Sequence, residues 1–327
     1  MELKTSAAGP RLKIGISACL LGQEVRFDGG HKRDQFLTEV LGPHVEWVPI
    51  CPEVEMGLGT PRETLRLVRV DGNQGLRMMT TRTGVDHTDG MNRWANRRLE
   101  ALAREAPDLC GYVLKKDSPS CGMERVKTFG ARGAPERNGR GLFATALIAR
   151  FPALPVEEEG RLADPRCREN FIERVFAYCR LKDLFKPGWT HGQLVQFHTA
   201  HKMSLLAHST ENCEALGRLV ANGQQTPKRE LRTAYERLFM TTLAMPSTRR
   251  RHVNVLMHML GHLKTKLEAA SKRELLDSIG EYRKGTAPLI VPLTLMRHHA
   301  RVYGIEYLMG QSYMEPHPRE LMLRNHV

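Results

Sequence analysis

Two patterns of hydrophobic and polar residues divide the chain. In the first part, short apolar runs bounded by Gly and Pro alternate with stretches of helical periodicity. The apolar runs predict strands at 13–19, 45–50, 65–70, 76–82, 109–115 and 154–157. The periodic stretches predict helices at 31–42, 87–106 and 142–151. Strand–helix–strand units form parallel sheets with right-handed crossovers, so we expect an α/β domain with a Rossmann-like parallel sheet.

Turn signals refine this first part. Residues 71–75 have the composition of a hairpin turn between two of the predicted strands. The Gly- and Arg-rich segment 129–141 is expected to be a mobile loop.

The second part of the chain shows helical periodicity and little else. The pattern predicts helices at 165–185, 190–208, 212–222, 227–244, 247–268, 271–284 and 292–308. The helix-breaking sequence Lys186–Gly188 places the boundary near 186, so we expect an α/β domain at 1–186 and an all-α domain at 187–327. The helix at 165–185 is expected to bridge the two domains, and 285–292 to be a rigid connector.

The chain length and the N-terminal sequence indicate which classes of protein are excluded. The chain has 327 residues, enough for two domains with sizeable cores. No run approaches about 18 consecutive apolar residues, and the N-terminus lacks the apolar core of a signal peptide. We therefore expect a cytoplasmic protein without membrane spans, in which thiols stay reduced. The seven cysteines are then better explained as ligands, nucleophiles or core residues than as disulfides.

The charge of the chain is strongly positive. The formal net charge is +13, with +5 on residues 1–155 and +8 on residues 156–327. Such an excess serves solubility, or it indicates a polyanionic partner, most simply nucleic acid.

Three cysteines, Cys19, Cys51 and Cys121, each come after a predicted strand. The carboxyl ends of parallel strands share one edge of a sheet, so the three thiols are expected to converge. Their spacing matches neither the close pairs of zinc sites nor the ferredoxin runs. Three converging thiolates do suit a 4Fe–4S cluster with one open iron. The alternative is that they are buried core residues, and Cys110, inside a strand, is the most credible substitute ligand.

Charged and hydroxyl side chains accompany these cysteines. They are Arg26, Asp28, Glu53, Glu55, Arg62, Ser118 and Ser120. A carboxylate near an open iron activates water. The structural alternative for Glu53 is a charge at a helix N-terminus, and for Arg62 it is an ion pair with a carboxylate. Candidate substrate contacts are Arg26, Asp28, Arg62 and Ser120.

Long motifs in the first part resemble the thiouracil desulfidase (TudS) family. They are SACLLGQEVRFDG at 17–29, CPEVEMGL at 51–58, KDSPSCG at 116–122 and ENFIERVFAY at 169–178. The second part is similar to the helical domain fused to it in RudS proteins. The motifs there are FHTAHKMSLLAH at 197–208, NVLMHMLG at 254–261 and PLIVPLTL at 288–295.

The resemblance implies a RudS-type tRNA desulfidase that converts 4-thiouridine to uridine by hydrolysis, without an electron donor. It implies a 4Fe–4S cluster on Cys19, Cys51 and Cys121. The family's catalytic glutamate falls on Glu55 and its site serine on Ser118. A soft thiocarbonyl sulfur is expected to bind the open iron, while Glu55 moves a proton and Ser118 holds the pyrimidine edge.

The basic second part is expected to bind the tRNA backbone. Its candidate contacts are His201, Lys202, Arg249, Arg250, Arg251 and Lys264. Few aromatic residues accompany them, which favours recognition of backbone and shape, with the base flipped into the catalytic pocket. Two other functions remain open: a desulfidase of small thiopyrimidines such as thiouracil, and a non-enzymatic iron–sulfur protein that binds nucleic acid.

Overall fold

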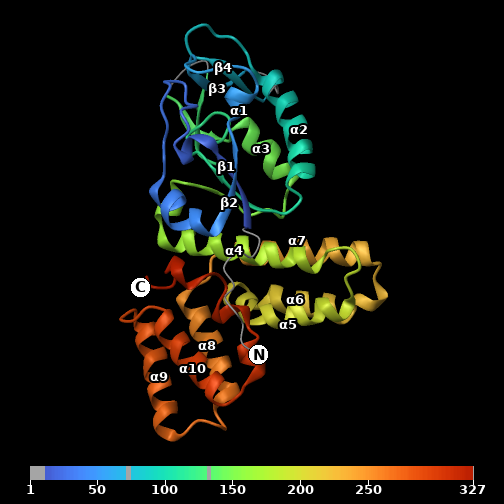
Figure 1. Ribbon diagram of the computed structural model, residues 1–327, viewed down its shortest axis with the longest axis vertical. Coiled ribbons are helices and arrows are strands. Elements are labelled where there is room, and N and C mark those ends of the chain that lie inside the picture. Colours follow the sequence, from blue (N-terminus) through green and yellow to red (C-terminus); the bar gives the residue numbers. More distant parts are fainter. Residues whose placement is uncertain (1–11, 71–74, 131–133, 327) are drawn as a thin grey trace. The chain divides into compact units, whose positions relative to one another are not determined.

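The computed structural model describes residues 12–70, 75–130 and 134–326 (Figure 1). The chain divides into two compact units, Met1–Ala163 and Asp164–Val327. The first is α/β and the second is helical, in the predicted order. The division falls before the expected boundary at 186, because helix α4 (Pro165–Leu184) packs against helices α5 and α7 of the second unit.

The first unit is built on a sheet of four parallel strands, as predicted. In spatial order they are β2 (Val45–Ile50), β1 (Leu12–Ser17), β5 (Leu109–Leu114) and β8 (Val156–Glu158). Every residue of β5 is buried, which is typical of a central parallel strand covered on both faces. Pro49 lies within β2, where it is tolerated because β2 is an edge strand.

Two helices of this unit, α2 (Thr88–Glu105) and α3 (Leu142–Arg150), pack against each other (Figure 1). The ring centroids of Trp94 in α2 and Phe143 in α3 lie 5.6 Å apart. Phe143 also meets Tyr112 of β5, with 5.9 Å between centroids. The Phe143 ring thus joins both helices to the sheet.

The predicted helix at 31–42 is wrong in its first half. Helical structure starts only at the π-helical segment η2 (Phe36–Leu41). Before it, the backbone N–H of Lys32 donates to the carbonyl of Cys19 at 2.9 Å. Pairing with the Cys19 loop therefore replaces the first helical turn.

A second four-stranded sheet contains the predicted hairpin. In spatial order its strands are β4 (Leu76–Thr80), β3 (Leu65–Arg69), β6 (Val126–Phe129) and β7 (Glu136–Gly139). Strands β3 and β4 are antiparallel, as expected, and the turn residues 71–74 lie outside the described residues. The stretch 129–141, for which the sequence predicts a loop, contains β7, because it pairs with β6. Residues 131–133 of that stretch also lie outside the description.

The second unit is helical throughout its described length. After α4 come α5 (His191–His208), α6 (Thr210–Ala221), α7 (Lys228–Ala244), α8 (Arg249–Leu263), α9 (Ala269–Lys284), α10 (Ile290–Val302) and α11 (Glu306–Met309). The predicted helix at 292–308 is interrupted, because Gly304 takes a left-handed conformation with φ of 62°. The expected connector 285–292 includes the start of α10.

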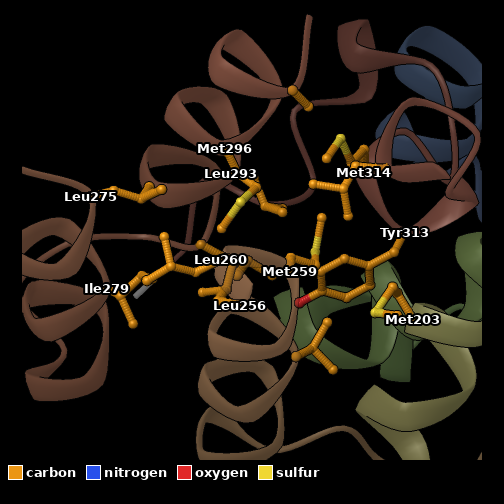
Figure 2. Close-up of a cluster of buried hydrophobic side chains, with 14 of the residues drawn as sticks. Met203, Leu256, Met259, Leu260, Leu275, Ile279, Leu293, Met296, Tyr313 and Met314 are labelled. Carbon is orange, nitrogen blue, oxygen red and sulfur yellow. The ribbon is translucent and has the colours of Figure 1, made fainter. Parts of the chain in front are cut away.

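Buried side chains of α5, α8, α9, α10, α11 and the turn at 312–314 form a hydrophobic cluster in this unit (Figure 2). Met259, Met296 and Tyr313 are fully buried there and lie close together in the figure. Within the part of the chain that the structure describes, no helix combines the length and apolar character needed to cross a membrane.

Candidate active site at the ends of the parallel strands

A cavity of about 380 Å³ lies where β1, β2 and β5 end. Strand β1 lies between β2 and β5, so the strand order reverses beside it, and such a switch point is where open α/β sheets bind ligands. The reactive side chains that line the cavity include Cys19, Arg26, Cys51, Glu53, Arg62, Lys115, Ser118 and Cys121. The cavity has a volume typical of small-molecule sites.

Three different chain segments deliver the three thiols to this cavity. Cys19 lies in the 3₁₀ turn η1 (Ala18–Leu21) directly after β1. Cys51 is the N-cap residue of the single-turn helix α1 (Pro52–Glu55), directly after β2. Cys121 lies in the loop after β5. By contrast, Cys110 lies near the start of β5, and its Sγ donates to the carbonyl of Asp108 at 3.1 Å.

The loop of Cys121 depends on close backbone packing. Asp117 has a left-handed backbone with φ of 60°. A Cβ on Gly141 would lie 2.3 Å from the carbonyl oxygen of Ser120, so only glycine allows α3 to start against this loop.

Burial raises the pKa of all three thiols, to about 11 for Cys19, to about 12 for Cys51 and well above the ordinary value for Cys121. The carboxylate of Glu53 raises the pKa of Cys51 and Cys121 further. The ammonium of Lys115 partly offsets the effect on Cys19. Thiolates in this cavity therefore need compensating positive charge, which a metal centre provides.

The three thiols share one cavity. Within residues 12–70, 75–130 and 134–326, no group of three His, Cys, Asp or Glu side chains is arranged around a single metal position. Thiols that face one cavity from three strand ends fit an iron–sulfur cluster, in which each thiolate binds its own iron.

The carboxylate of Glu53 lies in the cavity wall and takes part in a hydrogen-bond network beside these thiols. Its Oε1 accepts hydrogen bonds from Ser120 Oγ (2.5 Å) and Ser118 Oγ (3.5 Å). Its Oε2 lies 3.8 Å from Arg62 Nη2 and 3.6 Å from Cys51 Sγ. The network holds one anionic group in a defined position beside the cysteines.

Glu55, to which the resemblance assigns the catalytic role, is not part of the cavity wall. Its Oε1 accepts from the backbone N–H of Cys51 at 3.2 Å, and its Oε2 accepts from Arg98 Nε of α2 at 3.1 Å. The ion pair with α2 orients the short helix α1 so that Glu53, rather than Glu55, faces the cavity. The geometry therefore favours Glu53 as the carboxylate that meets a substrate.

The other predicted substrate contacts occupy different positions. Arg62 lines the cavity, where Nη1 donates to the carbonyls of Val25 and Gly59, both at 2.9 Å. Arg26 also lines it and pairs with Asp28 at 3.4 Å, whereas Asp28 itself is exposed outside the wall.

Ser120 is fully buried behind the cavity wall. Its hydroxyl lies 2.9 Å from that of Ser118. Ser120 therefore supports Glu53, while Ser118 faces the cavity.

Sequence reasoning missed Lys115 as a residue of the cavity. Its Nζ pairs with Glu159 Oε1 at 2.5 Å, and its backbone N–H donates to Ser17 Oγ at 3.0 Å. The position directly after a buried parallel strand was the available signal.

In the helical unit, Lys202, Arg250 and Lys264 are exposed. The prediction that His201 is a surface contact is wrong, because this side chain is only 3% exposed. Its Nδ1 bonds the carbonyl of Phe197 at 2.8 Å, and its Nε2 lies 3.3 Å from Arg180 Nε.

Arg249 and Arg251 are partly exposed and already have protein partners. The Arg249 guanidinium lies over the ring of Tyr282, 5.9 Å from its centroid. Arg251 Nη1 donates to the carbonyl of Pro246 at 3.2 Å.

Two protein-family models match different parts of the chain. The family model described as 2-thiouracil desulfurase matches residues 14–159. A second family model, described as a protein of unknown function (DUF1722), matches residues 202–318.

Two curated relatives are each covered almost completely by this chain. Uncharacterized protein YbgA of Escherichia coli (strain K12) is 32% identical over 161 residues, which are 49% of this chain and 95% of YbgA. Uncharacterized protein YbbK of Bacillus subtilis (strain 168) is 32% identical over 154 residues, which are 46% of this chain and 98% of YbbK. A solved structure, described as the 4Fe–4S-dependent thiouracil desulfidase TudS, is 34% identical; the match covers 47% of this chain and 94% of that chain, with a TM-score of 0.38.

Proposed function

Because the chain belongs, through residues 14–159, to the 2-thiouracil desulfurase family, we propose that it is an iron–sulfur-dependent desulfidase acting on 4-thiouridine in tRNA. The reaction is a hydrolysis in which the C4 carbon of the base exchanges sulfur for the oxygen of water and sulfide leaves. Carbon keeps its oxidation state, so the reaction needs no electron donor.

One observation carries this proposal. Three thiols from three strand ends share a cavity with the carboxylate of Glu53, which is held by serine hydroxyls and an arginine. The three thiols are an all-sulfur donor set, and the cavity volume of about 380 Å³ is within the range of small-molecule sites.

A 4Fe–4S cluster on Cys19, Cys51 and Cys121 supplies, when bound, one iron with an open position, a Lewis acid for a soft thiocarbonyl sulfur. The remaining steps belong to the protein's own residues. Glu53 is positioned to take a proton from the attacking water and to return it to the leaving sulfide or to the ring. Ser118 presents its hydroxyl from the cavity wall as a hydrogen-bond partner for the pyrimidine edge.

The cations of the cavity support the same chemistry. Arg26, Arg62 and Lys115 line the wall, so negative charge that develops on sulfur is stabilised electrostatically. Arg62 is anchored by hydrogen bonds to two backbone carbonyls, which fix its guanidinium in the wall.

The choice of tRNA as substrate rests on charge. The chain has a net charge of +13, and Lys202, Arg250 and Lys264 are exposed on the helical unit. Exposed cations contact phosphates without reading bases, so base selection stays with the cysteine cavity.

A second candidate substrate is a free thiopyrimidine such as 2-thiouracil. The name of the matching family favours it. Both substrates use the same cavity, and only the tRNA requires the basic helical unit.

The decisive experiment uses full-length protein reconstituted with iron and sulfide under anaerobic conditions. It is incubated with bulk bacterial tRNA, with 4-thiouridine nucleoside and with 2-thiouracil, and the products are measured by nucleoside mass spectrometry. Loss of 4-thiouridine from tRNA at a higher kcat/KM than from the nucleoside supports the proposal. Turnover of 2-thiouracil alone establishes the second candidate, and no turnover of any substrate refutes both.

A further inference from the structure

A second hollow, of about 250 Å³, lies beside the cysteine cavity. Its wall is formed by Leu65, Arg66, Leu67, Thr81, Asp117, Pro119, Val126, Lys127 and Phe129. Leu65, Asp117 and Pro119 also line the cysteine cavity. Two neighbouring parts of one ligand could therefore occupy the two hollows at the same time.

The cationic side chains of this hollow come from one face of the second sheet. Leu67 of β3 pairs with Thr128 of β6, and both are buried on the inner face. Side chains alternate along strands, so Arg66 and Lys127, each one position earlier, lie on the opposite face. The Arg66 guanidinium lies over the ring of Phe129, 5.5 Å from its centroid.

Among the residues that the structure describes, no acidic side chain pairs with the two cations of this face. Within the described parts of the chain, neither Arg66 nor Lys127 has an ion-pair partner, and Arg66 Nε has no hydrogen-bond partner. The one carboxylate of the wall, Asp117, is paired instead with Arg137 at 3.2 Å. A cation stacked on an aromatic ring beside a second cation is a setting that suits an anionic, planar ligand.

We propose that this hollow binds the nucleotide that neighbours the target base in an RNA strand. Arg66 and Lys127 contact its phosphodiester, and Phe129 with the overlying guanidinium provides a stacking surface for its base or an apolar face for its ribose. The two hollows share wall residues, as required for two successive nucleotides of one strand. This inference rests on the proposed function and assigns part of RNA recognition to the α/β unit itself.

The test compares a trinucleotide carrying a central 4-thiouridine with the free 4-thiouridine nucleoside. Arg66→Met removes the charge at similar length. The matched control is Arg69→Met on the same strand, since Arg69 lies on the opposite face and pairs with Glu136 at 3.8 Å. For each reconstituted full-length protein, we measure the ratio of kcat/KM for the trinucleotide to kcat/KM for the nucleoside.

We expect Arg66→Met to lower this ratio about tenfold, which is the contribution of one charge-assisted contact. The slope of the logarithm of trinucleotide affinity against the logarithm of salt concentration should become less steep by about one. Arg69→Met is expected to leave the ratio within about twofold. Equal ratios in the two variants overturn the inference, as does a wild-type protein that uses the trinucleotide no better than the nucleoside.

A binding measurement separates this inference from the proposed function. Fluorescence anisotropy reports binding of a labelled trinucleotide to the same proteins whether or not sulfur is removed. Binding that is weakened by Arg66→Met but not by Arg69→Met supports the hollow even if no substrate is desulfurised. Desulfurisation of the nucleoside with identical trinucleotide binding in both variants refutes the hollow and leaves the proposed function intact.

Discussion

Replacement of Glu53 by glutamine tests whether Glu53, rather than Glu55, is the proton acceptor in helix α1. The substituted amide would keep the size of the side chain and one oxygen that accepts from Ser120, but it would remove the anionic proton acceptor beside the thiols. Loss of a positioned general base costs about 100- to 10,000-fold in kcat. We therefore expect Glu53→Gln to lower kcat for thiouracil or 4-thiouridine by a factor in that range.

The matched control is Glu55→Gln, two residues further along the chain. Glu55 makes a partly exposed ion pair with Arg98 and accepts a hydrogen bond from the backbone N–H of Cys51. An amide oxygen can retain this hydrogen bond, so the expected cost is about 1 kcal/mol in the free energy of unfolding. We expect only a small change in kcat, because this side chain is outside the cavity wall.

Both variants are assayed at matched iron content, determined per protein chain, so that a loss of activity cannot come from a lost cluster. Single-turnover rates under anaerobic conditions compare the chemical step directly. If Glu53→Gln keeps activity within about fivefold of wild type, or if Glu55→Gln loses as much as Glu53→Gln, the assignment of the proton acceptor from this geometry is refuted.

Other parts of the molecule give three further predictions. Cys51→Ala should abolish activity and lower iron content after reconstitution, whereas full iron content with retained activity would contradict the cluster assignment. Replacing Lys202 and Arg250 together by alanine should raise KM for tRNA about tenfold, as expected for two lost phosphate contacts, while turnover of free thiouracil stays unchanged; equal losses on both substrates would argue against tRNA binding by the helical unit. Acid should destabilise the helical unit, because burial lowers the pKa of His201 to about 3 and of His252 to about 4. Below about pH 6.5 these two histidines bind protons in the unfolded chain but not in the folded one. The unfolding free energy should therefore fall by up to about 1.4 kcal/mol per pH unit for each histidine as the pH drops towards 4. His252→Gln should make this slope, measured by urea denaturation, less steep, and an unchanged slope would contradict the reasoning.

The sequence by itself determined the α/β architecture of the first unit and the segments that reach the site. Strands β1 and β5 are apolar runs that are largely buried, and β2 is a short run of Val, Trp and Ile residues that begins and ends on buried positions. Cys19 and Cys51 follow two of these strands directly, and the ends of parallel strands share an edge. The local sequence pattern was sufficient to predict that these cysteines meet. In a parallel sheet all strands run in the same direction, so residues that directly follow the strands lie at the same edge of the sheet.

Only tertiary packing distinguishes the positions of Glu53 and Glu55 relative to the cavity. Helix α1 is a single turn, too short for periodicity to show which face points inward. The contact between Glu55 and Arg98 of α2, a residue 43 positions away, sets the orientation of the turn. Sequence motifs alone placed the catalytic role on the glutamate that the structure leaves outside the cavity wall.

Tertiary packing also decided which basic residues of the helical unit are available to a partner. His201 and Lys202 are adjacent on α5, yet the first is buried against Phe197 and Arg180 while the second is exposed. The face of a helix that becomes buried depends on the helices packed around it, and that information lies in distant parts of the chain. For the same reason, the hollow beside the cysteine cavity becomes visible only when β3 and β6, about 60 residues apart, are paired.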